Sequence, residues 1–206
     1  EDWYAISMAD GNQAQYPTWF RPENEDDGSF TAHTPSGKAI ARMPNKGTFY
    51  DQTHFPYLNG YPDNFKSLDE AMDLVLWSAF VHSPWDHAHE DDFWTQLRTK
   101  CLALRESTDR ALMIVVGCNL FEWGTFLRRM DNFMMDLYLD PVNVEKLLDA
   151  LMEKHLQFLE KVCQYAGDVV DIVRFGDDLG MDSGPFMDPA TYRQLFKPRH
   201  KALCDH

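Results

Sequence analysis

Two adjacent carboxylates, Asp177 and Asp178, are the residues of this sequence best placed for chemistry. They follow Gly176, directly after the apolar, β-branched run 169–175. Acidic side chains at the carboxyl end of a buried parallel strand lie where α/β folds place ligands and catalytic groups. Neighbours on an extended segment start on opposite faces, so we expect one to face substrate and the other to bind loop amides. We favour Asp177 as the substrate-facing carboxylate and Asp178 as the hydrogen-bonded one. The alternative is that one caps the loop backbone and the other is solvated.

A second loop of the same kind follows the apolar run 111–117. If both runs are parallel strands, both loops belong at the ligand end of the sheet. Packing or helix capping is the alternative role for each of its residues. Cys118 has no general base at a recognisable spacing, so we interpret it as structural. Our candidates for substrate contact in this loop are Asn119, Phe121, Glu122 and Trp123. Met181, which follows Asp177 and Asp178 in the chain, is a fifth candidate.

His87 and His89 form an HxH pair among acidic residues, and imidazole and carboxylate are ligands for divalent metals. Known HxH metal sites end a buried strand, whereas a helix and a proline turn precede this pair. The acidic residues 90–92 also fit the preference for negative charge at a helix N-terminus. We therefore assign no metal ligand here.

These candidates need elements that hold them in place. The runs 111–117 and 169–175 read as strands covered on both faces. Asp140-Pro141 and Asp188-Pro189 each combine an N-cap with proline at the first helical position. An apolar stripe between residues 144 and 166 predicts one long helix, with His155 as a core histidine. The order strand, helices, strand, helix predicts a parallel βαβα unit.

The N-terminal part has a different character. Two alternating runs around Pro35-Ser36-Gly37 predict a β-hairpin within residues 29–44, and an aromatic loop follows at 44–66. Those aromatic residues either line a pocket mouth or pack a long connection. Ser67 and Glu70 have capping-box spacing and predict a helix start. We divide the chain into a hairpin and aromatic region, 1–66, and part of an α/β domain, 67–206.

Composition restricts the function classes. The 206 residues carry a formal net charge of −14, which argues against nucleic acid or an anionic membrane as partner. No apolar run approaches the ~18 residues that span a bilayer, and no signal peptide pattern occurs. The four cysteines are dispersed without CxxC spacing, each in or beside an apolar segment, which favours reduced, buried thiols and a cytoplasmic location.

The stretch from 175 to 201 also carries a family resemblance. FGDDLG, a following Gly-Pro pair and the helix start DPxxYRxxFKPRHK resemble the uroporphyrinogen decarboxylase-like superfamily. The branch containing cobamide-dependent methyltransferases is the most similar. The resemblance is strongest over 169–201 and extends more loosely through 111–139. It implies an α/β fold of the (β/α)8 TIM-barrel type. Because a complete barrel takes ~250 residues, we expect this chain to be an internal segment of a full barrel.

The resemblance implies methyl transfer from a methylcobamide to a thiol or related acceptor, assisted by zinc. Its zinc ligands come from a His-x-Cys element that residues 1–206 lack. A tetrapyrrole (uroporphyrinogen) decarboxylase is one alternative, although the arginine-rich motif of those enzymes is absent. A half-barrel without catalysis that works through a partner chain is another, and it predicts an exposed apolar face. The implied substrate is a small molecule or a corrinoid; a corrinoid protein and a homodimer stay open as partners.

Overall fold

The computed structural model describes residues 3–8 and 11–206. The chain divides into two compact units, Glu1–His82 with Phe126–Met130, and Ser83–Thr125 with Asp131–His206. The sequence-based division at 66/67 followed a change in composition. The compact units divide at 82/83 instead, and a short later segment belongs to the first unit.

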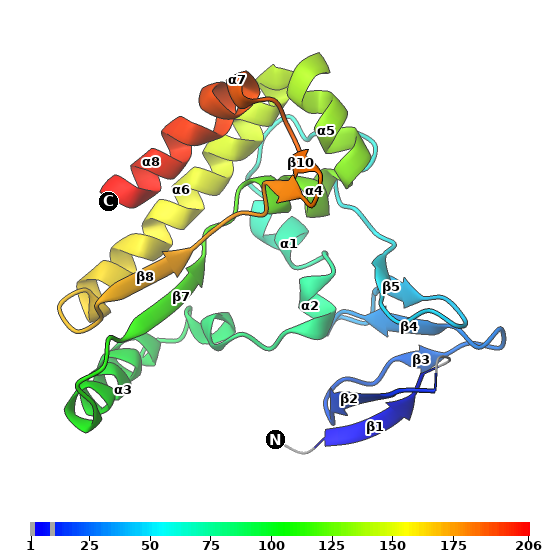
Figure 1. The fold of residues 1–206 in the computed structure, drawn as a ribbon, viewed down its shortest axis with the longest axis horizontal. Helices are drawn as coiled ribbons and strands as arrows, with labels where there is room; N and C mark the ends of the chain where they lie inside the picture. The colour runs from blue at the N-terminus through cyan, green and yellow to red at the C-terminus, as the bar shows by residue number, and fades with distance from the viewer. Residues whose placement is uncertain (1–2, 9–10) are drawn as a thin grey trace. The chain divides into compact units, whose positions relative to one another are not determined.

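The first unit contains two small antiparallel sheets (Figure 1). The hairpin predicted within 29–44 is confirmed, with Gly37 in its turn at φ 84°. Strand order in the larger sheet follows the chain, β3-β4-β5-β6. The strands are β1 (Trp3–Ser7), β2 (Gln13–Pro17), β3 (Glu23–Asn24), β4 (Phe30–His33), β5 (Ala39–Met43) and β6 (Asp51–Gln52).

Aromatic rings form much of the packing in this first unit. Phe20 is 4% exposed and its ring centroid lies 5.0 Å from that of Phe80 and 5.9 Å from that of Tyr50. The predicted capping box at Ser67 is wrong, because that side chain makes no cap hydrogen bond. The predicted helix is instead divided into α1 (Leu68–Met72) and α2 (Trp77–Phe80).

The second unit is mixed α/β and is organised around one parallel strand pair, which confirms the predicted strand order. In the described part of the chain, this parallel sheet has two strands and no barrel closes. A 3₁₀ turn at Pro84–His87 precedes the helices, and a π-helical turn at Tyr192–Phe196 precedes the last one. The elements that lie in this unit wholly or in part are α3 (Phe93–Ser107), β7 (Met113–Gly117), α4 (Phe121–Arg128), α5 (Met130–Leu139), α6 (Pro141–Ala166), β8 (Ile172–Phe175), β9 (Gly180–Met181), β10 (Gly184–Pro185), α7 (Pro189–Thr191) and α8 (Lys197–Asp205).

Both predicted N-caps form. The Asp140 carboxylate accepts the amide N–H of Asn143 at 3.4 Å at the start of α6. The Asp188 carboxylate accepts those of Ala190 at 2.8 Å and Thr191 at 3.1 Å at the start of α7. Each carboxylate binds amides that have no partner inside the helix, so these local signals set the helix starts.

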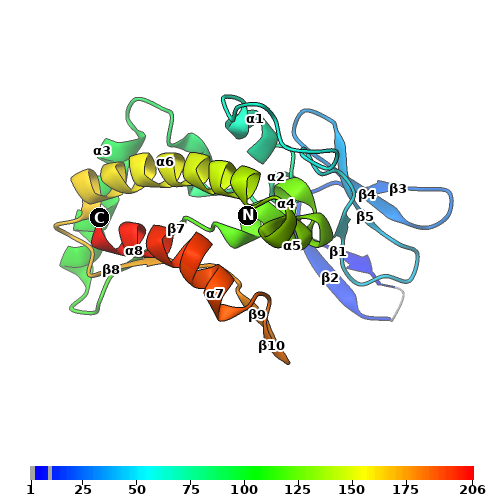
Figure 2. The ribbon, with the colours of Figure 1, turned by 90° about the horizontal axis from the view of Figure 1, so that it is seen from above.

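Helix α6 supplies the central apolar layer of the second unit. Its inward stripe includes Leu147, Leu148 and Leu151, which are fully buried. Helices α6 and α8 run side by side in both views (Figures 1 and 2). The described part of the chain contains no helix that is both long and apolar enough for a membrane crossing.

Strand β7 is covered on one face and β8 is largely exposed, so the prediction of two buried faces is wrong. In β7, Ile114 and Val116 are at most 9% exposed, whereas Met113 is 55% exposed and Val115 47%. Ile172 pairs with Met113, shares its face and is 47% exposed. The described residues supply helices for one face of the pair and no second layer for the other, so these apolar side chains stay in contact with solvent.

Helix α3 is attached by the packing of Trp94 on α6 and by arginines. Its apolar Leu104 is 54% exposed. The Arg98 guanidinium instead donates two hydrogen bonds, of 2.6 and 2.8 Å, to the Asp168 carboxylate. Arg105 donates to the Val169 carbonyl at 2.9 Å and also pairs with Asp171. These bonds connect α3 to the turn that leads into β8.

Candidate active site

Asp177 is the most firmly held carboxylate at the carboxyl end of the strand pair. It accepts the amide N–H groups of Leu120 at 2.9 Å, Phe121 at 2.7 Å and Glu122 at 3.0 Å. Its side chain is 2% exposed. The carboxylate therefore caps the N-terminus of α4, where unpaired amides and the helix dipole favour negative charge.

The turn after β7 explains why Asp177 holds this place. Gly117 and Cys118 have φ angles of 73° and 61°, so the chain turns sharply and directs the first amides of α4 toward the end of β8. Asp178 is exposed, and its Oδ1 accepts a long bond of 3.5 Å from the Gly180 amide. We predicted Asp178 as the hydrogen-bonded group and Asp177 as the substrate-facing one. The two positions are reversed, because alternation along the strand does not fix on which side the helix begins.

His200 connects α8 to the same carboxylate. Its Nε2 lies 3.2 Å from Asp177 Oδ2, and its Nδ1 lies 3.4 Å from the Tyr192 hydroxyl. The His200 side chain is 19% exposed. Sequence analysis missed this contact, because His200 stands in a run of basic residues with no spacing that links it to Asp177.

Glu122 is a carboxyl group of this site whose proton affinity is raised. Asn119 donates its side-chain N–H to the Glu122 carboxylate. Burial raises the pKa of Glu122, and the charges of Asp177 and Asp178 raise it further, while the Asn119 bond opposes the shift. A half-buried carboxyl with a raised pKa beside an exposed carboxylate can accept or deliver a proton.

His155, on α6, contacts the backbone of the loop that carries Asn119 and Glu122. Its Nε2 lies 2.9 Å from the Asn119 carbonyl oxygen, and because a carbonyl only accepts, Nε2 carries the proton. His155 is 7% exposed, and burial lowers its pKa. The prediction of a core histidine with a satisfied nitrogen is confirmed.

Cys118 is an inert thiol. It is 4% exposed, and burial raises its pKa to about 12. At that pKa the reactive thiolate is scarce near neutral pH, which agrees with a structural role.

The remaining predicted contact residues lie in different surroundings. Phe121 is 2% exposed and packs on the rings of Phe186 and Phe196, with centroids 5.5 and 6.0 Å away, so it belongs to the core. Trp123 is half-buried in the first turn of α4. Met181 is 55% exposed on the β9–β10 hairpin.

A metal centre is not apparent among the described residues. They contain no group of three or more His, Cys, Asp or Glu side chains arranged to hold an ion. In the HxH segment, His87 Nδ1 lies 2.7 Å from Glu90 Oε1. The zinc implied by the family resemblance therefore finds no fitting donor set in the described residues.

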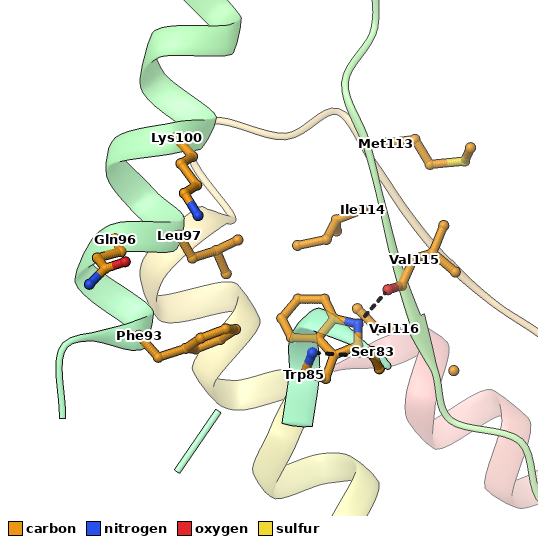
Figure 3. A pocket seen from close by; sticks show the side chains of 11 residues that line it. Ser83, Trp85, Phe93, Gln96, Leu97, Lys100, Met113, Ile114, Val115 and Val116 are labelled. Atoms are coloured by element: carbon orange, nitrogen blue, oxygen red, sulfur yellow. Dashed lines mark hydrogen bonds between the residues drawn. The ribbon is translucent and has the colours of Figure 1, made fainter. Parts of the chain in front are cut away.

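A cavity of about 750 Å³ opens beside β7, in the same unit (Figure 3). It lies between the turn at Trp85, helix α3 and the strand, and it extends to Gly117, the last residue of β7. The cavity is thus one residue along the chain from the loop that carries Asn119 and Glu122.

Comparisons with known proteins identify no family for this chain. No protein-family model matches it, and no curated protein matches it. A solved structure described as a methyltransferase from Methanosarcina mazei is similar with a TM-score of 0.46 and 14% sequence identity. The alignment covers 80% of this chain and 42% of that one, so the chain spans less than half of that methyltransferase.

Proposed function

We propose that this chain forms the substrate-binding end of a uroporphyrinogen decarboxylase-like (β/α) barrel enzyme, which transfers a methyl group from a methylcobamide to a thiol or related acceptor. The FGDDLG and DPxxYRxxFKPRHK motifs support the family assignment. The observation that carries the chemistry is the placement of Glu122, with its raised pKa, beside Asp178 at the carboxyl end of the parallel strands.

Methyl transfer to a thiol releases a proton that the protein must accept. The new bond forms between sulfur and the methyl carbon, and the cobalt–carbon bond breaks with its electron pair left on cobalt. In this proposal the thiol proton passes to the Glu122 carboxylate, which Asn119 orients, or to Asp178. Asp177 is excluded from this role because three amides and His200 surround it. We assign no step to zinc, since the described residues offer no donor set for it.

The test is demethylation of methylcobalamin by a thiol, followed by absorbance, with the full-length protein. We expect Glu122→Gln to lower the turnover rate by about 10²-fold, the lower range for general acid–base catalysis. Asp178→Asn should lower it less. Asp182→Asn is the matched control, because Asp182 is exposed on the β9–β10 turn, and it should keep wild-type activity. Full activity in Glu122→Gln would refute the assigned role. Release of CO₂ from uroporphyrinogen without methyl transfer would favour the decarboxylase instead.

A second candidate function, a half-barrel that works through a partner chain, is favoured by the uncovered strand face. Met113, Val115 and Ile172 present adjacent apolar side chains there. Burying that face against another chain would remove these side chains from water. Sedimentation equilibrium of the purified protein tests this candidate, which predicts reversible association. A monomer at every concentration, with methyl transfer intact, would reject it.

A further inference from the structure

We propose that the cavity between Trp85, α3 and β7 binds an amphipathic anion, namely an apolar chain that ends in a single carboxylate. This inference does not depend on the proposed methyl transfer. The cavity volume of about 750 Å³ lies within the 300–1,000 Å³ that is usual for small-molecule sites.

The wall at Trp85 is apolar and preformed. The indole N–H of Trp85 donates to the Val115 carbonyl at 3.0 Å, so its polar atom is already satisfied and the ring presents carbon to the cavity. Phe158 packs edge-on against this ring with centroids 4.9 Å apart, and Phe93 does so at 5.9 Å. A ring fixed on these sides loses little freedom when a ligand arrives.

Aliphatic side chains complete the apolar lining. Leu97 extends from α3 and Ile114 from β7 into the space between the two elements (Figure 3). Ile114 is 9% exposed and forms an apolar part of the cavity wall on the strand side. This surface suits a flexible hydrocarbon chain better than a polar molecule, which would leave hydrogen-bonding groups without partners.

Lys100 supplies the charge that selects an anion. It lines the cavity from α3, one turn beyond Gln96 (Figure 3). Among the described residues Lys100 has no ion-pair partner, and the lining contains no Asp or Glu to neutralise it. Gln96 donates its amide to Asp92 instead. In a chain of net charge −14, a cation left without a carboxylate beside an apolar cavity is complementary to a ligand carboxylate.

A strand from another chain is the competing occupant, because the described residues place no partner strand on one edge of β7. The Val115 carbonyl on that edge already accepts the Trp85 indole N–H. An added strand would have to break this bond and displace the aromatic wall. The small amphipathic anion requires neither change.

The test measures binding of decanoate and of decanol, which has the same chain length without the charge, to the full-length protein by titration calorimetry. We expect decanoate to bind more tightly than decanol. Lys100→Met, which keeps the apolar stem, should weaken decanoate binding about five-fold and leave decanol unchanged. Lys161→Met is the matched control, an exposed lysine on α6, and it should bind both as the wild type does. Leu97→Trp should fill the cavity and abolish binding of both.

Three results would overturn the proposal. The first is equal binding of decanoate and decanol with no effect of Lys100→Met. The second is unchanged binding in a folded Leu97→Trp variant, which would place the ligand elsewhere. The third is the absence of decanoate binding. This result would also be seen if the protein associated with itself through the β7 edge and so occupied the cavity. Because Lys100 lies outside the carboxylate site, methyl transfer by Lys100→Met reports separately on the proposed function.

Discussion

Replacing Asp177 by asparagine removes the charge that links the end of β8 to the first amides of α4. The carboxylate now accepts three amide hydrogen bonds and lies 3.2 Å from His200 Nε2. Asparagine has nearly the same shape but offers one acceptor oxygen. Its NH₂ group must then face either an amide N–H donor or the histidine.

The expected loss follows from these contacts. Hydrogen bonds to a charged group contribute about 1.5–3 kcal/mol each, and neutral ones about 0.5–1.5 kcal/mol. A buried donor without a partner costs about 1–3 kcal/mol more. Since the Asp177 side chain is 2% exposed, water does not replace the lost bonds. We expect Asp177→Asn to lower the free energy of unfolding by about 3 kcal/mol.

Urea unfolding followed by circular dichroism at 222 nm measures this loss. Asp178→Asn is the control, because Asp178 is exposed and has one long amide bond, and we expect it to change the free energy by less than about 0.5 kcal/mol. Unfolding of Asp177→Asn at the wild-type urea concentration would show that the Asp177 charge does not stabilise the fold. An equal loss of stability in the Asp178 variant would show that burial and amide bonds do not distinguish the two carboxylates.

Two further predictions concern the same unit. At Gly124 an added Cβ would lie 2.2 Å from the ring of the fully buried Phe133, so Gly124→Ala should lower the free energy of unfolding by about 1–3 kcal/mol; a gain in stability from helix propensity would contradict this. Burial lowers the pKa of His155 below its ordinary value of 6.5. The contribution of the buried, neutral histidine to the free energy of unfolding is therefore complete above pH 6.5. It falls as the pH drops from 6.5 toward the folded-state pKa, because the unfolded chain then binds the proton first. The glutamine of His155→Gln can still donate to the Asn119 carbonyl but cannot titrate. The urea midpoint should therefore fall more between pH 7.5 and pH 5.5 for the wild type than for the variant. Equal decreases in the midpoint would contradict a buried neutral histidine.

The local elements could be predicted because their signals are short-range. Asp140-Pro141 and Asp188-Pro189 mark helix starts, since a carboxylate binds the first free amides and proline lacks the N–H that would be unpaired. The alternating runs around Gly37 identified a hairpin through a turn that requires positive φ. At Ser67 a helix begins as predicted, but the Ser67 side chain makes no cap hydrogen bond, which shows that spacing makes a cap bond available without ensuring it.

The helix starts at Asp140 and Asp188, the two strands and the carboxylates at the strand ends could be predicted, because they depend on neighbours a few residues apart. The burial of Asp177, the exposure of Asp178, the contact of His200 with Asp177 and the core position of Phe121 are known from the folded chain alone. The same holds for the uncovered face of the strand pair. Each of these depends on which distant element packs against each side, and an alternation of side chains along a strand carries no information about what lies opposite it.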